Sequence, residues 1–146
     1  MSNKSEIALQ KFESGYNCAQ SVLLAYCNDV NIDSSTASKI GWGFGAGMGR
    51  RQEVCGAVTG GIIAIGAKYG TQQDDKKAAT ELIYSKTKDL LNRFQSIHGT
   101  FICLELLNGC NLMTEKGQKH FEEKRLKEKV CNQCVCSVTQ ILENIL

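Results

Sequence analysis

Four of the eight cysteines in this chain lie where the sequence predicts the first turn of a helix. Backbone N–H groups and the helix dipole stabilise a thiolate at such a position. The thiolate is both the nucleophile and the metal ligand of cysteine chemistry. If the four residues meet in space, they would suit a bound soft metal or an exchanging disulfide, and the residues alone leave both chemistries open. The four candidates are Cys18, Cys55, Cys103 and Cys131.

The first two candidates have favourable neighbours along the chain. Asn17 is predicted to cap the helix that begins at Cys18, because an asparagine side chain accepts hydrogen bonds from the first backbone N–H groups. Before Cys55, Arg50 and Arg51 supply two positive charges that favour a thiolate. The apolar residues after Cys55 recur at helical spacing, so we expect this cysteine to point inward from an early turn.

The other two candidates have less uniform surroundings. Cys103 follows Gly99, which is typical of a helix end, and Thr100, which is expected to cap the next helix. Cys110 shares the predicted helical face of Cys103 and is therefore a candidate additional thiol. Cys131 opens an apolar stripe at spacings of four and three residues, although the turn before it also has a helical pattern.

The remaining cysteines are interpreted as core residues, because free cysteine is often buried and packs as a small hydrophobic side chain. This interpretation covers Cys27, Cys134 and Cys136. Cys134 also forms a CxxC pair with Cys131, so it stays a second candidate for an additional thiol.

The elements that must position these cysteines are predicted to be helices. The chain has no proline, and its apolar residues repeat every three or four positions, which predicts an all-α fold: one compact domain over 1–146 with about seven or eight helices. The clearest helix covers 74–97, with Asp74 and Asp75 at its start and Gly99 after its end. The other helices are expected over 5–14, 18–29, 34–40, 54–69, 100–108, 117–129 and 131–146.

Two glycine-rich segments are expected to bring backbones close together. Segment 41–50 lacks the GxxxxGK[ST] pattern of a phosphate loop, which argues against nucleotide binding, and its glycines alternate with Trp42 and Met48 as in a buried loop. Gly56 and Gly60, four positions apart, leave one helical face almost without side chains, where a helix or a cofactor could approach. The residues expected to line the site are Asn17, Gly45, Gly47, Gly56 and Gly60.

Composition and charge narrow the setting. A formal net charge of +2 over 146 residues is too small to predict binding to nucleic acid or to an anionic membrane. No apolar stretch reaches the roughly 20 residues of a membrane helix. The polar start of the chain predicts a cytoplasmic protein, in which thiols stay reduced or hold metal. The mixed charges of 115–129 are typical of a solvated helix.

The motifs around the cysteines occur in an ordered combination that spans nearly the whole chain. The motifs are GYNCAQSV at 15–22, GFGAGM at 43–48, CGAVTG at 55–60, Cys103 with 105–107, and Cys131 with Val135. By these motifs the chain resembles the C-GCAxxG-C-C family of redox-active proteins. The resemblance implies a small prokaryotic protein of helical fold, in which Cys18, Cys55, Cys103 and Cys131 correspond to four characteristic cysteines.

A similar domain occurs in split-Soret cytochromes, where an iron-sulfur centre accompanies haem. The only CxxC of this chain, at 131–134, is followed by valine rather than histidine. Covalent c-type haem is therefore not expected here.

The leading hypothesis is that the four cysteines, or three of them with a substitute such as Cys110, bind an iron-sulfur cluster for electron transfer or redox sensing. The alternatives are a thiol-disulfide redox protein and a structural zinc domain. Neither His98 nor His120 has a recognisable catalytic spacing to a cysteine, so no catalytic residue is assigned and a redox or electron-transfer role is preferred to substrate conversion. The expected partner is an unidentified redox protein, with a homodimer left open.

Overall fold

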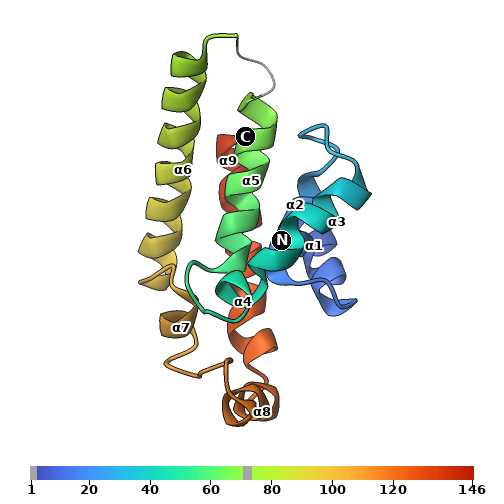
Figure 1. The fold of residues 1–146 in the computed structure, drawn as a ribbon, viewed down its shortest axis with the longest axis vertical. Coiled ribbons are helices and arrows are strands. Elements are labelled where there is room, and N and C mark those ends of the chain that lie inside the picture. Colours follow the sequence, from blue (N-terminus) through green and yellow to red (C-terminus); the bar gives the residue numbers. More distant parts are fainter. Residues whose placement is uncertain (1–2, 71–73) are drawn as a thin grey trace.

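The computed structural model describes residues 3–70 and 74–146, and the regular secondary structure of these residues is helical (Figure 1). Within these residues no strand forms, and the antiparallel pairing of Val54 with Ile102 is an isolated bridge. Over the same ranges, no helix combines the length and the apolar character needed to cross a membrane. The α-helical elements are α1 (Asn3–Glu13), α2 (Cys18–Tyr26), α3 (Ser34–Gly41), α4 (Gly45–Met48), α5 (Gly56–Gly70), α6 (Lys76–His98), α7 (Cys103–Leu106), α8 (Glu115–Glu123) and α9 (Asn132–Ile145).

Two short turns of other helix types also occur among the described residues. A 3₁₀ turn, η1 (Trp42–Phe44), precedes α4, and a π-helical turn, η2 (Lys127–Cys131), leads into α9. Because α4 is a left-handed turn, the described residues contain eight right-handed α-helices. The predicted all-α fold with about seven or eight helices is confirmed.

Helix α5 is the centre of the fold. It lies between α6 on one side and the group of α1, α2 and α3 on the other, with α9 behind it (Figure 1). The glycines of α5 make this position possible, because a Cβ atom on Gly60 would lie 2.7 Å from the carbonyl oxygen of Ala19 in α2. The Gly60 face therefore packs against a helix backbone. The core around α5 includes the buried side chains of Val22, Leu23, Val58, Ile65, Leu90, Phe94, Val135 and Leu142.

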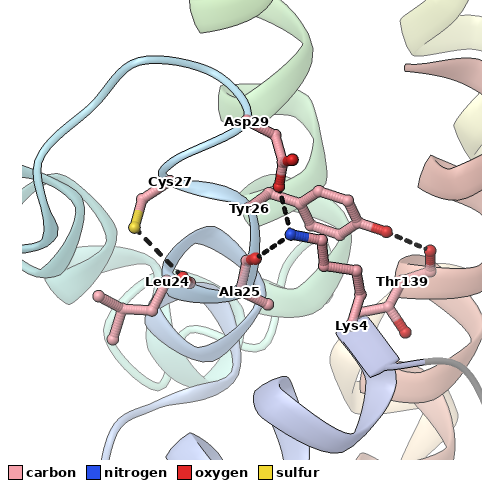
Figure 2. Close-up of polar contacts among 7 residues, drawn as sticks. All are labelled: Lys4, Leu24, Ala25, Tyr26, Cys27, Asp29 and Thr139. Atoms are coloured by element: carbon pink, nitrogen blue, oxygen red, sulfur yellow. Dashed lines mark hydrogen bonds and ion pairs between the residues drawn. The ribbon is translucent and has the colours of Figure 1, made fainter.

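Polar contacts fix the two N-terminal helices to α9 (Figure 2). The Tyr26 hydroxyl of α2 donates to the Thr139 carbonyl oxygen at 2.7 Å, and the Ser5 and Thr139 hydroxyls are 2.6 Å apart. Lys4 forms an ion pair with Asp29 and donates to the Ala25 carbonyl oxygen at 3.1 Å. The two bonds to Thr139 are buried, so they hold α1 and α2 in one register against α9, whereas the Lys4–Asp29 ion pair is exposed.

Several predicted helix ends are confirmed. Asn17 caps α2 through a reciprocal capping box with Gln20, Asp75 caps α6, and Gly99 ends α6 in a left-handed conformation with φ +82°. The helix expected over 100–108 is shorter: α7 is a single turn that begins at Cys103. The Thr100 hydroxyl accepts a hydrogen bond from the Ile102 N–H and so shapes the approach to α7 instead of capping it.

Replacing Gly60 by alanine tests the close packing of α5 on α2. The added methyl group would overlap the Ala19 backbone, so we expect Gly60→Ala to lower the free energy of unfolding by about 1–3 kcal/mol in a urea titration. Gly66→Ala on the same helix is the matched control, because its Cβ meets nothing within 4 Å. That control should raise stability by up to about 1 kcal/mol, since alanine favours helix over glycine. Equal effects of the two substitutions would contradict the assigned packing.

Candidate functional site

A cavity of about 600 Å³ lies at the end of the molecule that carries α4, α7 and α8 (Figure 1). Five cysteines from four different parts of the chain line it. Three of them are buried and two are half-buried, so their side chains share one space with little exposure at the surface. These five are Cys18, Cys55, Cys103, Cys131 and Cys134.

Three of the four predicted site cysteines lie at helix starts. Cys18 is the first residue of α2, Cys55 immediately precedes α5, and Cys103 is the first residue of α7. The expectation that Cys131 opens a helix is wrong. The backbone is helical on both sides of Cys131, because η2 continues directly into α9 and the Asn132 N–H is already bonded to the Lys127 carbonyl oxygen. The sulfur of Cys131 therefore gains no free N–H groups from a helix terminus.

The glycine-rich segment forms a left-handed turn beside the cavity. Residues 46–50 all have φ between +52° and +70°, and the Gly49 N–H bonds to the Gly45 carbonyl oxygen at 2.9 Å. Three of these residues are not glycine, and each adds about 1–2 kcal/mol of backbone strain. Glycine is required at position 47, because a Cβ atom there would lie 2.8 Å from the Cβ of Cys103.

The left-handed turn places its backbone, rather than its side chains, against the cysteines. The Ala46 N–H donates a hydrogen bond to the Cys18 sulfur, and a Cβ on Gly45 would lie 2.6 Å from the Asn17 side chain. The expectation of a wholly buried loop is wrong for Trp42 and Met48, whose side chains are 67% and 39% exposed.

The predicted site-lining residues fall into two groups. Asn17 and Gly56 line the cavity, and a Cβ on Gly56 would overlap the Cys18 sulfur. Gly45 and Gly47 pack next to Asn17 and Cys103 at its edge. Gly60 instead faces the α2 backbone, so the helix-packing interpretation holds at that position.

Gln52 is a site residue that the sequence reasoning missed. Its side chain is 2% exposed and its φ is +57°. The amide nitrogen donates to the Cys110 carbonyl oxygen at 2.7 Å, and the amide oxygen accepts from the Leu112 N–H at 2.8 Å. Gln52 also hydrogen-bonds the Cys103 thiol, while the Cys103 N–H bonds to the Glu53 carbonyl oxygen at 2.7 Å. Gln52 is polar and follows Arg50 and Arg51 in the sequence, so nothing in the local pattern predicts that its side chain is buried.

The two candidate additional thiols have different surroundings. Cys110 is outside the cavity lining, and its thiol donates to the Gly117 carbonyl oxygen at 3.2 Å. Cys134 is 2% exposed, lines the cavity, and donates a hydrogen bond to the sulfur of Cys55. Cys134 is thus a core residue and also a fifth thiol in the cavity. The Cys27 thiol donates to the Leu24 carbonyl oxygen (Figure 2), and Cys27 is outside the cavity lining, as expected for a packing residue.

Burial sets the protonation of most of the cavity thiols. It raises the pKa of Cys18 and of Cys103 to about 12 each and also raises the pKa of Cys131, and the neighbouring sulfurs add to each shift. Cys55 differs, because the hydrogen bond from Cys134 and the N–H groups of α5 lower its pKa despite its burial. The same bond raises the pKa of Cys134, since that thiol must keep its proton to donate it.

The mouth of the cavity is charged. Exposed Arg50, Glu122, Arg125 and Glu128 line it, so the cavity reaches the surface between the left-handed turn and the segment that joins α8 to α9. Lys127 is half-buried there and donates to the Phe12 carbonyl oxygen at 2.8 Å. The interpretation of 115–129 as a solvated segment holds for most of it, because the charged residues Lys124, Arg125, Glu128 and Lys129 after α8 are also exposed. It is wrong for Lys127, and the expected single helix is interrupted between α8 and η2.

The histidines lie apart from this cavity. The ring nitrogen Nε2 of His98 is 2.9 Å from the Ser137 hydroxyl oxygen, and its ring packs on Phe94. His120 is exposed on α8. Among the described residues, no group of three or more Cys, His, Asp or Glu side chains is close enough together to share a single metal ion. The thiols are thus distributed around the cavity wall instead of converging on one point.

The fold and the site define an all-α protein that gathers cysteines from separate helices around one internal cavity. The chain belongs to the family described as "Putative redox-active protein (C_GCAxxG_C_C)", whose model matches residues 16–145. This match confirms the resemblance found in the sequence. No curated protein and no solved structure matches the chain.

The raised pKa of Cys103 predicts a loss of stability in alkali. Its contribution is fully present below the ordinary thiol pKa of about 9 and is lost as pH rises toward about 12, because the unfolded chain releases the proton first. The free energy of unfolding of both metal-free proteins should fall between pH 8 and pH 10.5. We expect the fall to be about 2 kcal/mol smaller for Cys103→Ser than for the wild type, because the variant lacks this thiol.

Cys27→Ser is the matched control, since it removes a buried thiol outside the cavity. Urea titrations at the two pH values give all three free energies. An equal fall for Cys103→Ser and the wild type would contradict the assigned environment of Cys103.

Proposed function

We propose that this protein binds an iron-sulfur cluster in the cavity and serves electron transfer or redox sensing. Cys18, Cys55, Cys103 and Cys131 would hold the cluster. The observation that carries the proposal is that these four residues line one cavity of about 600 Å³. Successive members of the set are 37, 48 and 28 positions apart in the sequence. Four cysteine thiolates are the usual ligand set of such clusters.

The electrostatics of the cavity support a cationic guest. Three of the four thiols have a pKa raised by burial and by neighbouring sulfurs, so they do not ionise together in an empty site. Bound iron supplies the positive charge that offsets several thiolates in a dehydrated space. Binding would then release protons, and cluster loading should be more favourable at higher pH.

The spread of the thiols favours a cluster over zinc. A single zinc ion requires four ligands that all lie about 2.3 Å from one point. The described residues hold no group of three or more side chains with that convergence. The ligands of an iron-sulfur cluster bind different iron atoms and are therefore distributed around a larger body.

The neighbouring residues have defined roles in this proposal. When bound, the cluster would supply one-electron transfer. The Ala46 N–H and the Gln52 amide bond to Cys18 and Cys103, and such hydrogen bonds to ligand sulfurs raise the reduction potential by stabilising added negative charge. Gly56 leaves the room that the Cys18 sulfur occupies.

Iron and acid-labile sulfide measured on anaerobically purified protein test the proposal. We expect the wild type to contain both in similar amounts. Changing Cys18, Cys55, Cys103 or Cys131 to serine should remove most of both, because each variant lacks one thiolate ligand. Cys27→Ser should retain both, since Cys27 lies outside the cavity.

Two results would overturn the proposal. One is zinc without sulfide, which would point to a structural metal site. The other is the lack of both iron and sulfide after anaerobic reconstitution of a folded chain. Circular dichroism of each variant separates loss of a ligand from loss of the fold.

A further inference from the structure

Cys134 has no role in the proposed ligand set, although it lies in the same cavity as the four ligands. Cys134 is 2% exposed and Cys55 is 7% exposed. Both belong to the main hydrophobic core, both line the cavity, and they lie at the packed helices α5 and α9. A hydrogen bond from the Cys134 thiol to the Cys55 sulfur agrees with this placement. We propose that Cys55 and Cys134 form a reversible disulfide when the cavity holds no metal, with a low-molecular-weight disulfide as the oxidant. This inference concerns the metal-free protein and does not depend on cluster binding.

The packing of two helices brings these sulfurs together. Helices α5 and α9 both begin at the cavity end and run in the same direction (Figure 1). Their contact continues along their length: a Cβ on Gly61 would lie 3.0 Å from Val138, and the Tyr69 hydroxyl donates to the Ile145 carbonyl oxygen at 3.2 Å. Cys55 immediately precedes α5, and Cys134 lies in the first turn of α9, which continues from η2. Both side chains belong to the same hydrophobic core and line the same cavity, so the packing of α5 on α9 brings them to one place.

Cys55 is the preferred partner of Cys134 for a geometric reason. Cys131 is also nearby, but it lies on the same continuous helical segment as Cys134 and is only partly buried. Cys55 and Cys134 are both buried in the main core and face each other across the packed helices α5 and α9, and the hydrogen bond between their sulfurs agrees with this arrangement. A disulfide between them would link α5 to α9 through two cysteines that are 79 positions apart in the sequence.

The reaction is a balanced thiol-disulfide exchange. The Cys55 thiolate attacks one sulfur of the oxidant, whose S–S bond breaks, and the first small thiolate leaves and takes a proton. The Cys134 sulfur then attacks the Cys55 sulfur of the mixed disulfide. The second small thiolate leaves with the proton of Cys134. Two protein thiols are oxidised to one disulfide, and the small disulfide is reduced to two thiols.

The oxidant has a route to Cys55. The cavity that both cysteines line also contains the exposed side chains of Arg50 and Arg125, so it is continuous with the surface. Its volume of about 600 Å³ is within the range of pockets that accept small molecules.

Disulfide mapping of the full chain tests this inference. Reduced, chelator-treated protein is incubated without oxygen with oxidised glutathione, alkylated, digested with trypsin and analysed by mass spectrometry. Cleavage at lysine and arginine leaves Cys55 alone in peptide 52–68 and places Cys134 in peptide 130–146 with two other cysteines. We expect these peptides to be cross-linked, fragmentation to locate the bond at Cys134, and two of the eight thiols to be lost.

Matched variants identify the partner. Cys134→Ser should abolish the cross-link and leave Cys55 as a mixed disulfide with glutathione, whereas Cys136→Ser, from the same peptide, should retain the cross-link. A bond from Cys55 to Cys18, Cys103 or Cys131, or a wild-type chain that keeps only mixed disulfides, would overturn the inference. The readout needs no iron, so its failure is distinguishable from failure of the cluster proposal.

Discussion

Several sulfur atoms share one cavity in this protein, and keeping them away from water is the constraint on which the rest of the structure depends. Burial and mutual repulsion oppose ionisation of three of the thiols, as the raised pKa values of Cys18, Cys103 and Cys131 indicate. Such a cavity needs walls that approach the sulfurs closely without filling the space. Backbone provides these walls where side chains would not fit, at Gly47 and Gly56.

The left-handed turn at 46–50 follows from this requirement. Consecutive left-handed residues are unfavourable for L-amino acids, and here Ala46, Met48 and Arg50 adopt them. The conformation is stable because the surroundings fix it: Gly47 packs on Cys103, and the Gln52 N–H bonds to the Ala46 carbonyl oxygen at 3.2 Å. Strained backbone of this kind concentrates at functional sites, which agrees with its position beside the thiols.

Local signals in the sequence predicted the parts of the fold that local physics determines. The Asn17 side chain can cap the start of a helix, and it does so at α2. Gly99 tolerates the left-handed conformation that ends a helix, and it adopts this conformation at the end of α6. The wrong start at Cys131 arose because an apolar stripe cannot reveal where a continuous helix changes from π to α geometry. Gln52 could not be found, since its burial depends on the distant loop at 110–112.

The thiols of the cavity are not equivalent, and this difference connects the two proposed states. Cys55 alone among the four proposed ligands has a lowered pKa, and its main cause is the hydrogen bond from Cys134. With a metal present, that bond would stabilise a ligand thiolate from the second coordination layer. Without a metal, the same two sulfurs are already paired for exchange. One contact between α5 and α9 therefore supports metal binding and disulfide formation as mutually exclusive uses of Cys55, because a sulfur bonded to Cys134 has no thiolate left to donate.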